Sequence, residues 1–201
     1  MKKSYIFIIL LLISCSKDVP TLAKLPINAV IVAFGDSLTY GVGASATENY
    51  PAILSGLIQR EVINAGVSGE HTDQGLQRLS KILAEYQPDL LILCHGGNDL
   101  LQKTGEKKAA DNLIAMIELA QEYGSEVVLI GVPKPQLFLS SAADFYTEIA
   151  TKIKIPYDGD IIADVLSKKS LKSDLIHPNA KGYQKIADAI AKLLRQAKAI
   201  K

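Results

Sequence analysis

Short apolar segments that alternate with longer amphipathic ones constrain the fold of this chain most strongly. Apolar runs predict strands at residues 29–34, 61–66, 89–95, 126–132 and 152–157. Between them, apolar residues recur at helical spacing and predict helices at residues 48–60, 72–86, 108–124, 143–152, 160–168 and 179–197. Alternating strands and helices favour a parallel sheet with right-handed crossovers. The sequence therefore predicts a three-layer α/β/α fold, with a five-stranded parallel sheet in the order 2-1-3-4-5.

This strand order brings two polar turns to one crevice. Ligands of such sheets bind beyond the carboxyl ends of the strands, where the strand order reverses, which is here between the first and third strands. Gly35, Asp36 and Ser37 follow the first strand, and Gly96 to Asp99 follow the third. Each group also consists of residues that are common in turns, so neither group identifies a site by itself.

Composition excludes some broad classes of function. The chain has 201 residues, 48% of them hydrophobic, and a net charge of +1. This length fits one domain, and so small a charge gives no reason to expect a nucleic-acid partner. No cofactor and no metal site are expected, and we expect a monomer that acts on a small molecule.

The first fifteen residues differ from the rest. Lys2 and Lys3 precede an apolar segment that is too short to span a bilayer, and a small residue precedes Cys15. The run Leu-Ile-Ser-Cys that ends at Cys15 resembles a bacterial lipobox, which implies that Cys15 is lipidated. We expect a lipoprotein signal peptide at 1–14, a lipidated cysteine and tether at 15–28, and the folded domain at 29–201. An uncleaved anchor and a plain secretory signal remain the alternatives.

Lipidation at Cys15 predicts a location. The protein would be anchored in the bacterial cell envelope and face the periplasm, with its N-terminus in the membrane. Ser16 stands where inner-membrane lipoproteins of enteric bacteria carry aspartate, which favours the outer membrane. Cys94, the second cysteine, ends a buried apolar run and is interpreted as a small core residue.

Polar residues in four separate connections have the chemistry of a serine hydrolase. A serine nucleophile needs a base, a group that orients the base, and donors for the developing oxyanion. Asp174 and His177 are three residues apart in a loop, where a carboxylate can fix the imidazole tautomer. Asn98 offers an amide donor, and Gly69 offers a backbone N–H with no side chain in the way. Each feature alone also has an ordinary explanation as a surface loop or turn, and for Asp174 and His177 taken alone the surface loop is the better explanation.

Taken together, the four segments resemble a known family. They are FGDSL (34–38), NAGVSGEHTDQGLQRL (64–79), GGND (96–99) and DLIHPN (174–179). In this order they resemble the four blocks of the SGNH hydrolases, also called GDSL esterases. The resemblance covers about residues 29 to 195 and is greatest to periplasmic enzymes with acyl-CoA thioesterase, arylesterase and lysophospholipase activity. It implies the same flavodoxin-like, three-layer fold.

The resemblance also implies roles for individual residues. Ser37 would be the nucleophile, with His177 and Asp174 completing a catalytic triad. The N–H of Ser37, the N–H of Gly69 and the amide of Asn98 would form the oxyanion hole. The implied reaction is hydrolysis of carboxylic esters or thioesters, such as aryl esters, acyl-CoA thioesters or lysophospholipids, through an acyl-enzyme. We interpret Asp36 as a support for the turn.

Several alternatives stay open from the sequence. His95 stands before the Gly-Gly turn where an aliphatic residue is expected, and it could compete with His177 as the base, although a supporting role fits its strand-end position better. Leu137, Phe138 and Leu139 could form a wall for an acyl chain or pack on the core. A carbohydrate O-deacetylase of the same superfamily and a non-catalytic envelope lipoprotein are the rival functions. The run 41–46 imitates a dinucleotide fingerprint but lies too far after the first strand.

Overall fold

The computed structural model describes residues 19–135 and 141–201. Five strands lie in one parallel sheet in the order β2-β1-β3-β4-β5, which confirms the predicted order. The strands are β1 (Val30–Gly35), β2 (Glu61–Gly66), β3 (Leu90–Cys94), β4 (Glu126–Ile130) and β5 (Tyr157–Asp158). The α-helices are α1 (Ser37–Tyr40), α2 (Tyr50–Ile58), α3 (Thr72–Tyr86), α4 (Gly97–Gln102), α5 (Glu106–Glu122), α6 (Asp144–Ile153), α7 (Ile161–Leu166) and α8 (Ala180–Gln196), and a 3-10 helix, η1, covers Lys169–Leu171.

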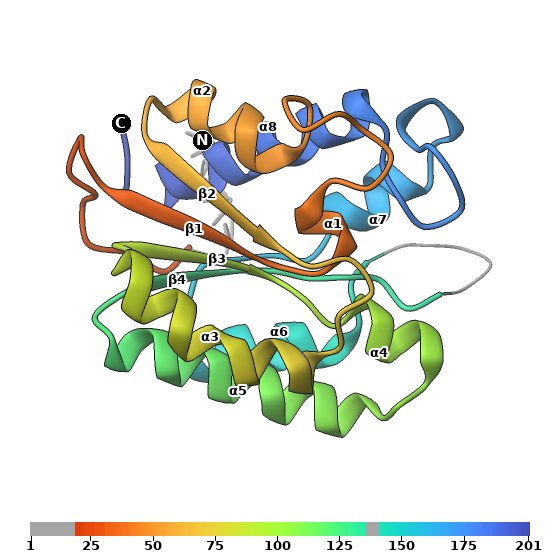
Figure 1. Ribbon diagram of the computed structural model, residues 1–201, viewed down its shortest axis with the longest axis horizontal. Helices are drawn as coiled ribbons and strands as arrows, with labels where there is room; N and C mark the ends of the chain where they lie inside the picture. The colour runs from red at the N-terminus through yellow and green to blue at the C-terminus, as the bar shows by residue number, and fades with distance from the viewer. Residues whose placement is uncertain (1–18, 136–140) are drawn as a thin grey trace, which may run out of the picture.

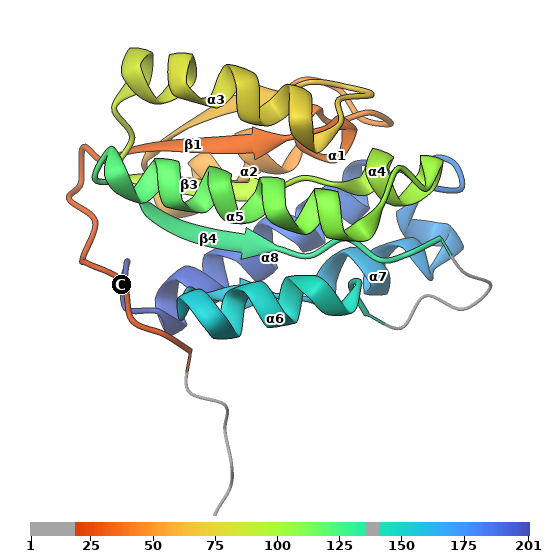
Figure 2. The same ribbon diagram turned by 90° about the horizontal axis from the view of Figure 1, so that it is seen from below.

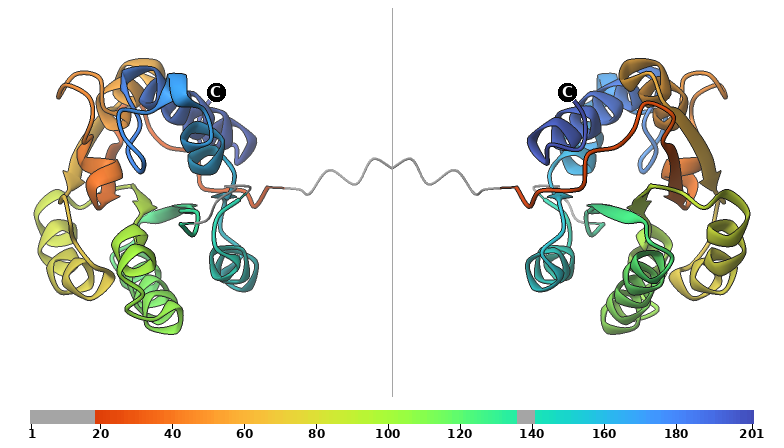
Figure 3. Two further views of the ribbon diagram at one scale, coloured as in Figure 1. Left: turned by 90° about the vertical axis from the view of Figure 1, so that its right-hand side faces the viewer. Right: turned by 90° about the vertical axis from the view of Figure 1, so that its left-hand side faces the viewer.

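The sheet is the middle of three layers, as the sequence predicts (Figure 1). Helices α2, α7 and α8 cover one face, and α3, α5 and α6 cover the other, as the views from below and along the sheet show (Figures 2 and 3). Every residue of β3 is buried, whereas β2 at the sheet edge contains no fully buried residue. The apolar run of β3 therefore reflects cover on both faces, and the weaker pattern of β2 reflects its place at the edge.

The position of the fifth strand differs from the prediction. The strand was expected at 152–157, but α6 continues through Ile153 and β5 consists of Tyr157 and Asp158. Alternation of lysine and isoleucine in this stretch imitates a strand. Ile153 also lies four residues after the buried Ile149, however, and so shares its helix face. The helix ends at Lys154, whose left-handed φ of 61° is an ordinary way to stop a helix.

Part of the segment that was expected to be a tether packs on the domain. Leu25 is buried, and the N–H groups of Leu22 and Leu25 donate to the carbonyls of Ala197 and Ala199 at 2.9 Å each. The folded unit therefore includes residues that precede 29. The predicted signal peptide and Cys15 lie outside the described residues. Among the helices of the described ranges, none is both long and apolar enough to cross a membrane.

Candidate active site

Ser37 lies where β1 turns sharply into a short helix. The strand ends at Gly35, Asp36 caps α1 with a side-chain oxygen 3.1 Å from the N–H of Leu38, and Ser37 is the first helical residue. Because Ser37 opens the helix, its N–H has no partner within the helix and is available to a ligand. Gly35 is required here, since a Cβ atom at this position would lie 1.9 Å from the carbonyl oxygen of Cys94.

Asp174 and His177 lie in a tight loop between η1 and α8. One Asp174 oxygen accepts from the N–H groups of Ile176 and His177 at 2.8 Å each, and the other lies 2.8 Å from His177 Nδ1. Partial burial would raise the pKa of Asp174, but the hydrogen bonds from His177 and from the two N–H groups outweigh it and hold the pKa below its usual value. An ionised carboxylate only accepts, so Nδ1 carries the imidazole proton and Nε2 is left as an acceptor.

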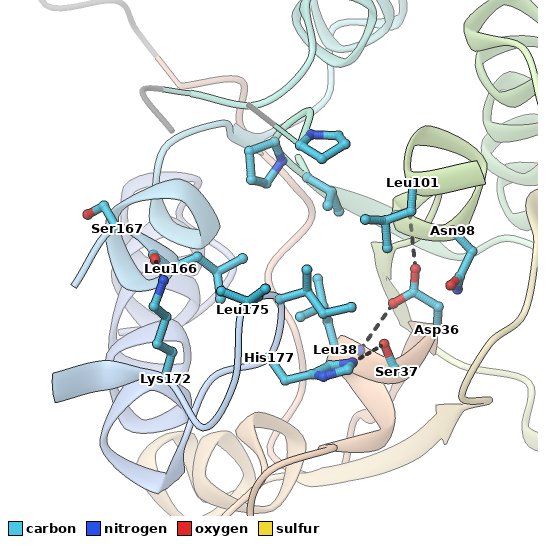
Figure 4. A pocket seen from close by; sticks show the side chains of 15 residues that line it. Asp36, Ser37, Leu38, Asn98, Leu101, Leu166, Ser167, Lys172, Leu175 and His177 are labelled. Atoms are coloured by element: carbon cyan, nitrogen blue, oxygen red, sulfur yellow. Dashed lines mark hydrogen bonds between the residues drawn. The ribbon is translucent and has the colours of Figure 1, made fainter. Parts of the chain in front are cut away.

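Figure 4 shows Ser37 and His177 pointing toward one another across the site. Ser37 Oγ lies 3.0 Å from His177 Nε2, although the two residues are 140 positions apart in the chain. The structure thus brings together Ser37, His177 and Asp174, with each donor facing an acceptor in turn. In this arrangement His177 can take the Ser37 hydroxyl proton while Asp174 stabilises the resulting imidazolium.

Asp36 connects the two turns at the crevice. Its side chain is buried, and its second oxygen lies 3.2 Å from the N–H of Gly97, which follows β3. Burial raises the pKa of Asp36, while the N–H groups of Leu38 and Gly97 oppose this shift. These contacts fit the turn-supporting role expected for Asp36.

Asn98 and Gly69 approach the site from two neighbouring connections. Asn98, in the first turn of α4, lines the same cavity as Ser37, and its Nδ2 donates to the carbonyl of Glu70 at 2.9 Å. Gly69 is exposed in the loop before α3, with a φ of 82° and open space where a Cβ would lie. Gly69 is not among the residues that line the cavity, so its link to Asn98 runs through the adjacent Glu70.

The cavity beside Ser37 has a volume of about 690 Å³ and is largely apolar. Its apolar lining comes from the segments that follow β1, β3, β4 and β5 and consists of Leu38, Leu101, Val132, Pro133, Pro135, Leu166, Leu175 and Ile176. Leu137 and Phe138, the predicted wall, lie outside the described residues. Leu101 and Leu175 were not expected from the sequence. Leu101 belongs to the short helix α4 and gives no signal of its own, whereas Leu175 is an apolar residue two positions before His177 in an otherwise polar loop and is 83% exposed.

His95 does not have the geometry of a competing base. It is fully buried and does not line the cavity. Nε2 lies 3.0 Å from Glu70 Oε2, and Nδ1 accepts from the N–H of Gly96 at 2.9 Å. Both ring nitrogens are therefore occupied away from Ser37. No cluster of three or more histidine, cysteine or acidic residues suited to a metal ion occurs in the described part of the chain.

A doubly wound sheet with a hydroxyl, an imidazole and a carboxylate at its carboxyl edge has the parts that ester hydrolysis needs. Residues 33–185 match the GDSL-like Lipase/Acylhydrolase family, and the chain belongs to this family. It is an enzyme that acts on ester bonds. The resemblance noted in the sequence and the fold that it implied are both confirmed.

Three similar proteins illustrate the relationship. The Escherichia coli (strain K12) protein "Thioesterase 1/protease 1/lysophospholipase L1" is 28% identical over 172 residues, covering 82% of this chain and 83% of that protein. An arylesterase of Vibrio mimicus is 27% identical over 174 residues, covering 82% of this chain and 87% of its own. The crystal structure of AlinE4, an SGNH-hydrolase family esterase, superposes with a TM-score of 0.67 at 31% identity, covering 87% of this chain and 98% of AlinE4.

Proposed function

We propose that the protein is a serine esterase that cleaves carboxylic esters or thioesters through Ser37, His177 and Asp174. One observation carries this proposal: Ser37 Oγ, His177 Nε2, His177 Nδ1 and Asp174 Oδ2 form a continuous relay with separations of 3.0 and 2.8 Å. Distances of this size allow proton transfer without further movement of the side chains.

The proposed reaction has two halves. Ser37 Oγ attacks the ester carbonyl carbon as His177 takes its proton, and the tetrahedral intermediate collapses when His177 protonates the leaving group. A water molecule then attacks the acyl-serine, His177 again takes the proton, and the acid leaves as Ser37 regains its hydrogen. The N–H groups of Ser37 and Gly69 and the amide of Asn98 would stabilise the oxyanion in both halves.

The cavity indicates the class of substrate. Its wall of leucine, isoleucine, valine and proline side chains suits an acyl chain, because burial of such a chain is favourable by roughly 0.8 kcal/mol per methylene. Aryl esters, acyl-CoA thioesters and lysophospholipids share such an acyl group, and the E. coli and Vibrio relatives are named as a thioesterase and lysophospholipase and as an arylesterase. We propose substrates of this class, rather than acetylated carbohydrates, for the enzyme.

A substrate panel tests this proposal. We expect kcat/KM for p-nitrophenyl esters to rise from acetyl to medium chains, and Ser37→Ala to abolish hydrolysis of all of them, of acyl-CoAs and of lysophospholipids. Ser80→Ala, a serine change on the exposed face of α3, is the matched control and should behave as wild type. Preference for an O-acetylated sugar would instead support the deacetylase, and wild-type turnover by folded Ser37→Ala would refute the mechanism.

We also propose that the enzyme is anchored in the bacterial cell envelope through a lipidated Cys15 and faces the periplasm, in the outer membrane rather than the inner one. The support is the charged start, the short apolar segment and the lipobox-like sequence that ends at Cys15. Two or more acyl chains on one residue would give stable membrane attachment.

A further inference from the structure

A largely buried charged cluster, in which the Arg78 side chain is 23% exposed, lies beside the candidate oxyanion hole and outside the relay of Ser37. It consists of Glu70 in the loop before α3, Arg78 on α3 and His95 at the end of β3. Arg78 Nε and Nη2 donate to the two Glu70 oxygens at 2.6 and 2.9 Å, and His95 Nε2 lies 3.0 Å from Glu70 Oε2. Glu70 is 7% exposed and His95 is fully buried. We call these three residues the Glu70 cluster.

Stability alone does not account for such a cluster. Removal of the Glu70 carboxylate from water costs several kcal/mol, the partly exposed Arg78 adds a smaller cost, and apolar replacements of similar volume are often as stable. Here Arg78 also stacks over the ring of Phe34, with its guanidinium carbon 4.0 Å from the ring centroid. An ion pair that is fixed by this many contacts restricts the backbone geometry of the strand ends and loops to which it hydrogen-bonds.

The Glu70 cluster contacts the carboxyl ends of three neighbouring strands, β1, β2 and β3. Arg78 Nη2 donates to the carbonyls of Ala65 in β2, at 2.7 Å, and of Gly35 in β1, at 3.3 Å. His95 directly follows β3, and its Nδ1 accepts from the N–H of Gly96, the residue that precedes α4. The cluster therefore joins the turn of the nucleophile to both connections that carry the proposed oxyanion donors.

The contact that matters most is between Glu70 and Asn98. The Asn98 amide has two N–H bonds, and one of them donates to the Glu70 carbonyl at 2.9 Å. This bond sets the plane of the amide, so the second N–H is directed by the position of the Glu70 backbone. Gly69 is the adjacent residue, and its peptide plane must move with the same loop. A shift of Glu70 would thus misplace both donors at once.

The protonation states of the cluster are consistent with this arrangement. Because the N–H of Gly96 donates to His95 Nδ1, the imidazole is neutral, and its proton lies on Nε2 and is donated to Glu70. Burial would raise the pKa of Glu70, but hydrogen bonds from His95 and Arg78 and the charge of Arg78 outweigh it and hold the pKa below its usual value. Glu70 is therefore ionised and accepts every one of these bonds.

We propose that Glu70, Arg78 and His95 are positioning residues that hold the Asn98 amide and the Gly69–Glu70 segment in the geometry that binds the oxyanion. None of the three lines the cavity, so they act through Asn98 and Gly69 rather than on the substrate. This inference rests on the proposed esterase mechanism. It extends that mechanism to a histidine that departs from the family pattern.

A double-mutant cycle tests the proposal. Glu70→Gln keeps the shape of the side chain and removes its charge. It should lower kcat on a short-chain aryl ester about 10- to 100-fold with KM nearly unchanged, which is the range for outer residues that orient the ligands of a metal site. Asn98→Ala removes the donor itself and should cost about 10²- to 10³-fold. If Glu70 acts largely through Asn98, the decrease in log kcat caused by Glu70→Gln should be at least halved when Asn98 is already alanine.

A pair of substitutions at His95 provides an independent measurement. His95→Phe keeps a ring but removes both hydrogen bonds, and we expect it to lower kcat as Glu70→Gln does. His95→Gln retains one donor and one acceptor and should restore most of the activity. Ser125→Ala is the matched control, because it removes a buried 2.6 Å hydrogen bond to the Pro88 carbonyl. This bond lies near the amino ends of β3 and β4, at the far end of the strands from the site. This control should lower stability and leave kcat unchanged.

The outcomes separate this proposal from the esterase mechanism. If folded Glu70→Gln and His95→Phe keep kcat within twofold, or if the loss is fully additive with that of Asn98→Ala, the positioning role is wrong. Circular dichroism and urea unfolding establish folding, and the isosteric Glu70→Gln decides the matter if His95→Phe does not fold. Activity in Ser37→Ala would refute the mechanism itself, whereas inactive Ser37→Ala beside active cluster variants would refute only the positioning role.

Discussion

Replacement of Asp174 by asparagine should harm catalysis more than replacement by alanine. In the native loop, one Asp174 oxygen accepts two backbone N–H groups at 2.8 Å and the other accepts from His177 Nδ1. Asparagine can keep the two backbone hydrogen bonds only if its single oxygen takes the place of the Asp174 oxygen that accepts from the N–H groups of Ile176 and His177. Its NH2 group must then face Nδ1, which can no longer carry a proton. The proton moves to Nε2, and His177 becomes a donor toward Ser37 instead of a base.

The size of the effect follows from how firmly the amide is held. A flipped amide would place its NH2 against two N–H groups, and an unsatisfied donor costs about 1–3 kcal/mol. The side chain is 52% exposed, so the low end of this range applies to each bond. Two such bonds favour the wrong tautomer by about 2 kcal/mol, or roughly 30-fold. Loss of the carboxylate charge that stabilises the imidazolium adds to this, so kcat should fall by about 10³- to 10⁴-fold, or roughly 4–5.5 kcal/mol. In Asp174→Ala, water can enter the exposed site and accept from Nδ1, so the loss should be smaller.

The assay is steady-state hydrolysis of one p-nitrophenyl ester by both variants, with urea unfolding as the check on stability. Asp111→Asn is the matched control, because Asp111 is 59% exposed and hydrogen-bonds a single partner, Lys107. We expect wild-type kinetics from this control. The reasoning is refuted if Asp174→Asn keeps kcat within tenfold of wild type, or if Asp174→Ala is the less active of the two.

Two further expectations concern the membrane and pH. Cys15→Ser should leave the protein unprocessed or release it into the soluble fraction, and mass spectrometry that finds unmodified Cys15 in membrane-extracted protein would contradict lipidation. Since the pKa of Glu70 is lowered on folding from its ordinary 4.5, its contribution to stability is present above about pH 4.5 and lost as pH falls through the lower folded value. Between pH 6 and about 3, the free energy of unfolding measured with urea should therefore fall more steeply for wild type than for Glu70→Gln. Equal slopes for the two proteins would contradict this expectation.

The central strands of the fold could be predicted because burial on both faces gives them a distinct sequence pattern. Strands β1, β3 and β4 are covered on both faces, so they read as unbroken apolar runs with polar residues at their ends. The last strand, β5, is two residues long and carries no pattern of its own. Its position depends on where α6 stops, and a lysine in the left-handed conformation gives no signal in the sequence.

The chemical residues of the site could be predicted for a related reason. Ser37, Asn98 and His177 each have an ordinary turn or loop explanation, but the predicted strand order brings all three to one edge of the sheet, and the structure places all three around one cavity. The walls of the cavity had no comparable signal. Leu101 and Leu166 belong to short helices whose apolar residues could equally have been core, and only the packing of the connections places them around one space.

The departure at His95 could be recognised from the sequence, but its meaning required the structure. An imidazole at the buried end of a strand must have partners for both nitrogens, because an unsatisfied buried polar atom costs about 1–3 kcal/mol. One partner, the N–H of Gly96, is adjacent in the chain, but the other, Glu70, is 25 residues away, and Glu70 is in turn held by Arg78 from the next helix. His95 is thus compatible with its site only while Glu70 remains in place, and the carbonyl of that same Glu70 orients Asn98. An aliphatic residue at position 95 would need no hydrogen-bond partners. The histidine therefore couples the integrity of the Glu70 cluster to the geometry of the proposed oxyanion donors.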